Sequence, residues 1–223
     1  MKKSEHILLV AIPKSASTSL MKTLAKLHQL DPVQDVSWAE NPAPNSSSFL
    51  HCIHSDLREL GESEVAMFSQ PGKLYKQHIF PSPNNLSKLE GLKKVVLLRS
   101  PKSVCLAYRR GALKNVHTLL PEFSTELSEN EWMEVALKKG LYSDLEFFYE
   151  TWMSLEKEDD VLIIYYDDLI INPVKTINQI EEFWGAVKSE GNIVLARERY
   201  SRRAGLEHKL FNFYSWLRGI LFD

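Results

Sequence analysis

The stretch Ile7-Leu-Leu-Val-Ala-Ile12, continued by Pro13-Lys14-Ser15-Ala16-Ser17-Thr18-Ser19, decides the fold of this chain. Its first part is a continuous apolar run, which predicts a buried strand. After the loop, Leu20, Leu24 and Leu27 recur at helical spacing and predict a helix with one buried face. Backbone N–H groups, hydroxyls and a lysine at the start of that helix form a cradle for an anion. The pattern is typical of nucleotide binding, although a capped helix after a buried strand gives a similar sequence.

The loop differs from the P-loop that binds nucleoside triphosphates. That loop reads G-x-x-x-x-G-K-[ST], and here neither glycine precedes Lys14. The run Pro13-Lys-Ser-Ala-Ser-Thr-Ser-Leu20 instead resembles the 5′-phosphosulfate loop of sulfotransferases, usually written P-K-[ST]-G-T-T-x-L, with Ala16 in place of the glycine. The resemblance implies that the 5′-phosphosulfate of 3′-phosphoadenosine 5′-phosphosulfate (PAPS) is bound by Lys14, Ser15, Ala16, Ser17, Thr18 and Ser19.

The composition is that of an ordinary soluble globular domain. Of the 223 residues 44% are hydrophobic and 25% are charged, and the formal net charge is −2. This balance argues against general binding of nucleic acid. Cys52 and Cys105 make no disulfide framework, so we expect a cytoplasmic protein. The apolar run before Pro13 is too short for a signal sequence or a membrane span, so neither is expected.

Strands and helices are expected to alternate along the chain. Further apolar runs predict strands at Phe49–Ile53, Leu74–Phe80, Lys94–Leu98 and Val161–Tyr166. Ser128 and Glu131 form a capping-box signature before a helix, and apolar residues from Leu141 to Leu155 recur at helical spacing. The segment 31–48, rich in Pro, Asn and Ser, predicts an irregular loop.

The order of these segments predicts an α/β fold with three layers, in which helices flank a mostly parallel sheet. One more helix is expected to start at Asn172-Pro173 and to end at Gly185. We expect a single domain over residues 1–223, in which 186–223 form a basic and aromatic C-terminal segment whose packing the sequence does not determine. Ligands of such sheets lie beyond the carboxyl ends of the strands, where Lys14 falls.

A second anion site is expected where the run Lys94–Leu98 ends on Arg99 and Ser100-Pro101 begins a helix. A surface arginine paired with a carboxylate is the alternative. The block resembles the sulfotransferase 3′-phosphate motif, R-[ND]-P-x-[DS]-x-x-x-S-x-Y, with matches at Arg99, Pro101 and Tyr108. The family's serine is Ala107 here, and we expect Ser103, one helical turn earlier, to replace it.

Two weaker resemblances extend the nucleotide site. The run from Val161 to Leu169 is similar to the family's strand that ends in Y-[ED]-D-L, which implies that Tyr166 lies near the nucleotide. Many family members carry a late basic segment that closes on the 3′-phosphate, and Ser201-Arg202-Arg203 resembles it. The resemblance therefore implies roles for Arg202 and Arg203 in binding the donor.

Lys76 and His78 are the candidate chemical groups. On a strand they share one face. Histidine is the natural general base near neutral pH, and lysine neutralises the charge of a leaving phosphate. The stretch resembles the sulfotransferase segment K-[TS]-H-[LIF]-P, in which the histidine is the catalytic base and the lysine assists it. The expected catalytic residues are therefore His78, Lys14 and Lys76, with His54 or Asp56 as the base if His78 is not.

The expected function is sulfuryl transfer from PAPS to a hydroxyl of a small-molecule or carbohydrate acceptor, with a homodimer as a further possibility and without a metal. A zinc site is conceivable at His51-Cys52-Ile-His54, which has three potential ligands. The sequence has no second Cys/His cluster to supply the remaining ligands of a structural zinc site, so a metal is not expected. Two alternatives stay open. An ATP-dependent kinase with a P-loop-like fold predicts dependence on Mg²⁺, and a non-catalytic relative that binds nucleotide or carbohydrate predicts binding without turnover.

Overall fold

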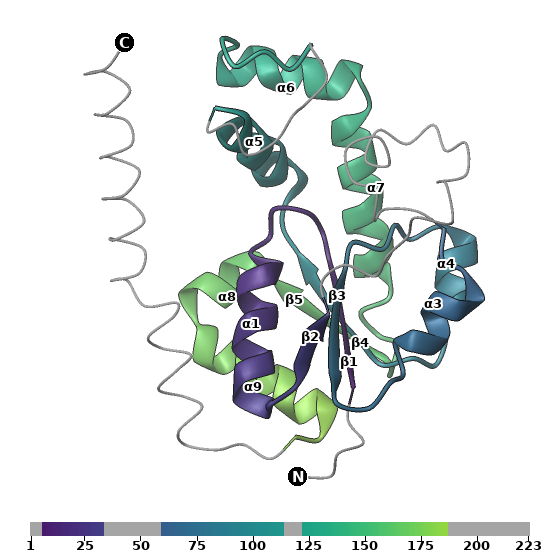
Figure 1. Ribbon diagram of the computed structural model, residues 1–223. Helices are drawn as coiled ribbons and strands as arrows, with labels where there is room; N and C mark the ends of the chain where they lie inside the picture. The colour runs from purple at the N-terminus through teal and green to yellow at the C-terminus, as the bar shows by residue number, and fades with distance from the viewer. Residues whose placement is uncertain (1–5, 34–58, 114–121, 187–223) are drawn as a thin grey trace. The chain divides into compact units, whose positions relative to one another are not determined.

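The structure is a computed structural model, which describes residues 6–33, 59–113 and 122–186 (Figure 1). Its elements in chain order are β1 Ile7–Ala11, α1 Ser17–His28, β2 Asp31–Val33, α3 Glu62–Met67, β3 Lys73–Gln77, α4 Pro83–Lys88, β4 Lys94–Leu98, α5 Pro101–Ala112, α6 Glu129–Lys138, α7 Leu141–Ser154, β5 Val161–Tyr165, α8 Tyr166–Ile171 and α9 Pro173–Trp184. The chain divides into two compact units at Tyr166.

A five-stranded sheet in the order β2-β3-β1-β4-β5 forms the centre of the first unit, and the pairings between its described strands are all parallel. β1 lies in the middle, where Val10 pairs with Gln77 on one side and with Val96 on the other. The predicted sheet is confirmed, and it is parallel throughout rather than mostly. The strands beside β1 are β3, which contains Lys76 and leads to His78, and β4, which leads to Arg99, and β5 beyond β4 leads to Tyr166.

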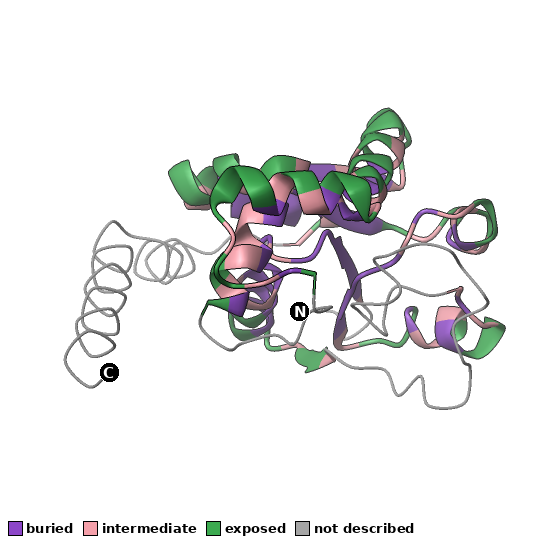
Figure 2. Cartoon of the chain, turned by 90° about the horizontal axis from the view of Figure 1, so that it is seen from above, coloured by how far each residue is buried: buried purple, intermediate pink, exposed green. Residues whose placement is uncertain are grey.

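Helices of the first unit cover both faces of this sheet, which gives the three layers that the sequence predicts. Alternate residues of β1 face opposite sides. Leu8 and Val10 belong to a core cluster with Phe148 and Trp152 of α7, and residues near α3 and α4 join it. On the other face α1 contacts β1, β2 and β3. Figure 2 shows the central strands buried, and the edge strand β2 and the outer faces of the helices exposed.

Most of the predicted helix boundaries are confirmed. Ser128 accepts a hydrogen bond from the backbone N–H of Glu131, whose side chain accepts one from the Ser128 N–H, so the capping box is present at α6. α5 begins at Pro101 and α9 at Pro173, each with proline in its first turn. Gly185 ends α9 in the left-handed conformation.

The structure corrects three boundaries. Residues 31–33 form the edge strand β2 rather than the start of an irregular loop, because the parallel partner β3 overrides their weak strand propensity. β3 ends at Gln77, before the predicted Phe80. β5 ends at Tyr165, and Tyr166 begins α8. The predicted strand Phe49–Ile53 lies outside the described residues.

The described chain forms two compact units, Met1–Tyr166 and Asp167–Asp223. Whether they act as one domain stays a prediction. Each unit is compact by itself. All four strand ends that the sequence motifs occupy belong to the first unit. The predicted C-terminal segment 186–223 lies outside the described residues apart from Ala186.

Candidate functional site

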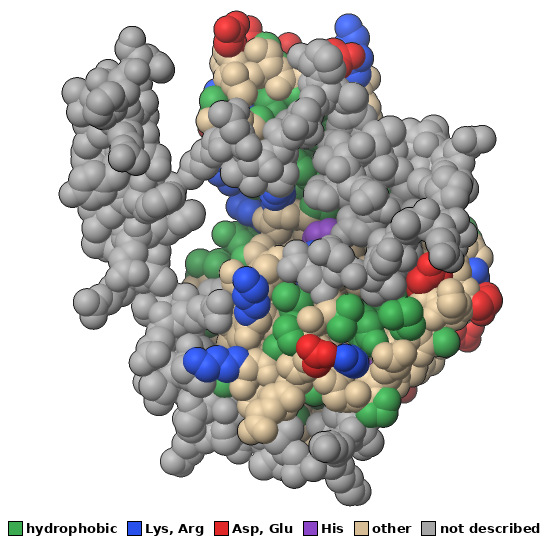
Figure 3. Space-filling view, viewed as in Figure 1, with side chains coloured by type: hydrophobic (Ala, Val, Ile, Leu, Met, Phe, Trp, Pro, Cys, Tyr) green, Lys and Arg blue, Asp and Glu red, His purple; other side chains and the backbone are tan. Residues whose placement is uncertain are grey.

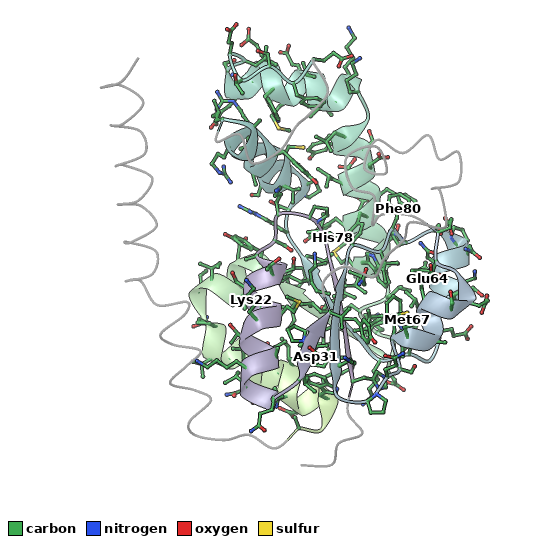
Figure 4. The ribbon with its side chains drawn as sticks, viewed as in Figure 1. Lys22, Asp31, Glu64, Met67, His78 and Phe80 are labelled. Atoms are coloured by element: carbon green, nitrogen blue, oxygen red, sulfur yellow. The ribbon has the colours of Figure 1, made fainter. Side chains whose placement is uncertain are left out.

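The strand order brings the sequence motifs to one edge of the sheet. In parallel strands the carboxyl ends share an edge, so the loops after β1, β3, β4 and β5 are neighbours there. The connection after β1 leads to β2 on one side, whereas the one after β4 leads to β5 on the other. Such a reversal of direction between neighbouring strands leaves a crevice for a ligand. The candidate site is the group of residues at this edge, which Figure 4 shows around His78.

The loop between β1 and α1 has a backbone shape that places its amides in a cradle. Lys14 and Ala16 both have left-handed backbone conformations, with φ of 62° and 65°. Ala16 is also the N-cap of α1, without a side-chain capping bond, and its carbonyl accepts from Ser19 and Leu20. Non-glycine residues rarely adopt this conformation. The alternation of ordinary and left-handed residues forms an anion-binding concavity of backbone N–H groups.

Some side chains of the loop stabilise the loop itself, and others are exposed at the site. The buried Ser15 hydroxyl donates to the Ile12 carbonyl at 2.6 Å, so its proton is engaged within the loop and any bond to an anion would come from its backbone N–H. Ser17 is also buried, whereas Thr18 and Ser19 are partly exposed. The hydroxyl most available at the helix N-terminus is therefore that of Thr18 or Ser19.

Lys14 is held above the side chain of Tyr108. Its Nζ lies 5.5 Å from the centroid of the Tyr108 ring, and Tyr108 itself is fully buried in α5. Burial and, second, the charge of Lys76 lower the pKa of Lys14 to about 8. The ammonium is thus partly desolvated and close to a like charge, and an anion placed between these lysines would relieve both effects.

Lys76 and His78 are in direct contact, as their spacing on one face predicts. Lys76 Nζ lies 3.1 Å from His78 Nε2, and both residues are buried. His78 Nδ1 lies 2.7 Å from the Ala11 carbonyl oxygen. Because a carbonyl only accepts, Nδ1 carries the proton, and Nε2 offers its lone pair to the lysine.

The protonation state of His78 follows from these contacts. Burial is the largest cause, and with the charges of Lys76 and Lys14 it lowers the pKa of His78 to about 3, while the Ala11 hydrogen bond acts in the opposite direction. The imidazole is therefore neutral near pH 7. A neutral ring whose tautomer is fixed by a backbone carbonyl can accept a proton at Nε2.

Arg99 connects the second motif to the first. Its Nη1 donates to the Lys14 carbonyl at 2.6 Å, and its guanidinium carbon lies 4.0 Å from the centroid of the Tyr166 ring. The ends of β1, β4 and β5 are therefore joined by one side chain. Tyr166 lies beside the arginine of the expected 3′-phosphate site, and its place near the nucleotide stays a prediction.

The structure does not connect the remaining predicted residues to the site. Ser103 is partly exposed in the first turn of α5, and its substitution for the missing serine stays a prediction. Arg202 and Arg203 lie outside the described residues, as do His51, Cys52, His54 and Asp56. The expected roles of these residues are therefore untested by the geometry.

Two contacts of the site, and one buried amide next to it in the sequence, were not predicted from the sequence. The Ala11 carbonyl that orients His78 is a backbone group, so no side chain signals it. The contact between Arg99 and the Lys14 carbonyl depends on neighbouring strands that are far apart in sequence. Gln77 is fully buried, and among the described residues neither its Oε1 nor its Nε2 has a hydrogen-bond partner. Its position between Lys76 and His78 gave the only hint.

No group of three potential metal-ligating His, Cys, Asp or Glu side chains occurs in the ranges 6–33, 59–113 and 122–186. Over the same ranges no helix is long and apolar enough to cross a membrane. The basic groups that these contacts bring together among the described residues are Lys14, Lys76 and Arg99. This donor set is suited to phosphate and sulfate oxygens.

Comparison with solved structures supports the fold. A mouse sulfotransferase, SULT7A1, complexed with PAP is 18% identical, with a TM-score of 0.59 over 88% of this chain and 64% of that chain. A sulfotransferase from Alicyclobacillus acidocaldarius is 11% identical, with a TM-score of 0.52 over 89% of this chain and 94% of that one. Retinol dehydratase in complex with androsterone and inactive cofactor PAP is 14% identical, with a TM-score of 0.55 over 87% and 64%.

These similarities concern the fold, because all three identities are low. The chain spans less than two thirds of the length of the mouse enzyme and of retinol dehydratase. A comparison with curated protein sequences finds no match. The model of the sulfotransferase domain family matches residues 4–209, which covers all the motifs discussed above. The chain therefore belongs to the sulfotransferase domain family.

Proposed function

We propose that this protein transfers a sulfuryl group from PAPS to a hydroxyl of an acceptor by in-line displacement. The observation that carries the proposal is the contact between Lys76 and a neutral His78, beside Lys14 and the anion loop. The base His78, the cations Lys14 and Lys76 and the N-terminus of α1 all lie at the carboxyl edge of the sheet. Membership of the sulfotransferase family supports the same reading.

The residues of the site fit a nucleotide with two separated anionic groups. Lys14 and the amides and hydroxyls of the loop up to Ser19 would hold the 5′-phosphosulfate. Arg99, next to Tyr166, would hold the 3′-phosphate, with Ser103, Arg202 and Arg203 as further predicted ligands. When bound, the donor supplies an activated sulfuryl group and a phosphate leaving group. Two of the similar structures are complexes with PAP, which is in keeping with this assignment.

In the proposed reaction His78 removes the proton of the acceptor hydroxyl through Nε2, with its ring held by the Ala11 carbonyl. Lys76 occupies Nε2 in the free protein, so it must leave this atom before the acceptor can use it. The negative charge of a bound donor gives the Lys76 ammonium an alternative partner. The same charge offsets two of the causes that lower the pKa of His78 and makes the ring a stronger base.

Lys14 and Lys76 would then stabilise the charge that develops on the leaving phosphate. The lowered pKa of Lys14, about 8, still leaves most of this amine charged near pH 7. Electrostatic groups fixed before the reaction contribute most of the rate in many enzymes, and removal of one donor of this kind costs roughly a hundredfold or more. Replacing Lys14 or Lys76 is therefore expected to lower kcat by about that factor.

The proposed acceptor is a small molecule or a carbohydrate with a hydroxyl group. The proposed location is the cytoplasm, and a homodimer is proposed as a possible assembly. The kinase alternative has less support, because Leu8 and Pro13 stand where the nucleoside-triphosphate loop G-x-x-x-x-G-K-[ST] has its two glycines before Lys14. The non-catalytic alternative requires a nucleotide site without a working base, whereas His78 and Lys76 are in contact.

The proposal is tested first by calorimetric titration of the purified protein with 3′-phosphoadenosine 5′-phosphate (PAP), with ATP and Mg²⁺ as the comparison. Preference for PAP without metal is expected, and preference for ATP with Mg²⁺ would support the kinase. Sulfate transfer from labelled PAPS to a panel of phenols, alcohols and sugars then separates the enzyme from a binding protein. The variant His78→Ala should bind PAP and lose turnover, and near-normal turnover would exclude His78 as the base.

A further inference from the structure

The two helices that follow the anion loops have an unusual charge composition. The chain as a whole has 27 Lys and Arg against 29 Asp and Glu. Neither α1 nor α5 contains an acidic residue, and between them they carry five Lys and Arg residues, namely Lys22, Lys26, Lys102, Arg109 and Arg110. The neighbouring α6 and α7 are the reverse, with several acidic side chains and the single lysine Lys138. Charge is therefore separated between helices of the same unit.

Four of these cations form what we call the basic face, which consists of Lys22, Lys26, Lys102 and Arg110. All four are exposed. The structure records no ion pair for any of them within the described part of the chain, whereas Lys73, Lys88, Lys94 and Lys139 are each paired with a carboxylate. Arg109 is excluded, because it donates twice to the Leu127 carbonyl and holds the loop before α6.

The basic face lies next to the candidate site. Lys22 and Lys26 are four residues apart on α1, so they share one stripe, about 8 and 14 Å along the axis from the first residue of the helix. Figure 3 shows Lys and Arg side chains near α1 and near the lower end of α5, and Figure 4 labels Lys22 on α1. The four cations are therefore carried by the two helices that begin at the anion-binding residues, α1 after the loop of Lys14 and α5 after Arg99.

We propose that the basic face captures the multiply charged sulfuryl-donor nucleotide and speeds its association with the anion loop, an inference that rests on the proposed function. The four side chains act on the encounter and do not touch the bound nucleotide. A surface of one sign raises the association rate of an oppositely charged ligand by roughly 10–1000-fold at low ionic strength. The acidic helices α6 and α7 repel the same ligand and so favour approach from the basic side.

The experiment is stopped-flow measurement of PAP binding at two ionic strengths. The test variant carries Lys22→Gln, Lys26→Gln, Lys102→Gln and Arg110→Gln. The control variant loses the same charge outside the two helices through Lys93→Gln, Lys138→Gln, Lys139→Gln and Lys157→Gln, all at exposed positions. Circular dichroism checks that both variants are folded.

At about 0.01 M salt, where charges act over about 30 Å, the association rate of the test variant should fall about tenfold, and that of the control about twofold or less. At about 0.15 M salt the difference should shrink, because charges then act over about 8 Å. The dissociation rate should stay unchanged in both variants.

Three results would overturn the inference. An equal loss in both variants would mean that only net charge matters. A loss that appears in the dissociation rate would mean that these side chains bind the nucleotide, and a change confined to the KM of the acceptor would assign the surface to the acceptor. Absence of PAP binding by the unmodified protein would instead overturn the proposed function, and the inference with it.

Discussion

Acid should unfold this protein partly through His78, and the effect can be calculated from its surroundings. The ring is buried, and Lys76 lies 3.1 Å from its Nε2, so its pKa is about 3 in the folded protein against an ordinary value of 6.5. Below pH 6.5 the unfolded chain gains a proton at this ring that the folded chain does not take up until the pH nears 3. Stability at this site is therefore complete above pH 6.5 and is lost as the pH falls through that window.

The size of the effect follows from about 1.4 kcal/mol per pH unit. Between pH 6.5 and pH 5 the loss is about 2 kcal/mol, a large part of the total stability of most domains. In the variant His78→Gln this titration is absent. We expect acidification from about pH 7.5 to about pH 5 to lower the free energy of unfolding of the unmodified protein by about 2 kcal/mol more than that of the variant.

The measurement is urea unfolding of both proteins at the two pH values, followed by circular dichroism. A second variant, Lys76→Met, separates the two main causes. Because burial is the larger cause, Lys76→Met should keep most of the acid sensitivity and reduce it only in part. Equal pH dependence in the unmodified protein and His78→Gln would refute the reasoning, because it would show that His78 titrates normally when folded.

Three further predictions concern single positions. Ala16→Gly should raise the free energy of unfolding by about 1 kcal/mol in a urea titration, because Ala16 has φ 65° and glycine adopts this conformation without strain; a loss of stability would contradict this. Gln77→Met should be neutral or stabilise by about 1–2 kcal/mol, because the buried amide has no partner among the described residues; a large drop in Tm would show that it has one. Arg99→Lys should weaken PAP binding roughly tenfold by calorimetry, because lysine keeps the charge but lacks the fork that reaches the Lys14 carbonyl and stacks on Tyr166; unchanged affinity would remove Arg99 from the site.

Local patterns predicted the elements that depend on local physics. A strand inside a parallel sheet that is covered by helices is buried on both faces, so its sequence is a continuous apolar run. β1 and β4 have such runs, and all their residues are buried. The capping box at Ser128 and the proline at the start of α5 and α9 satisfy helix ends through neighbours in the sequence. The same holds for Lys76 and His78, whose shared face follows from the two-residue repeat of a strand.

Other features depended on pairing between distant segments. Residues 31–33 became a strand only because β3 offers a parallel edge, and nothing in their own sequence favours that state. Left-handed backbone conformations usually occur at glycine, but here Lys14 and Ala16 adopt them. The sequence therefore predicted the loop but not the conformation of these two residues.

The sequence by itself determined the kind of fold, the positions of its anion loops and the residue types that can do the chemistry. Only the tertiary structure decided how these groups act on one another. It placed Lys14 and Lys76 so that burial and like charge lower the pKa of Lys14, and it joined Arg99 to the Lys14 carbonyl across neighbouring strands. Desolvation and electrostatic coupling depend on distance through space, and distance along the chain does not reveal them.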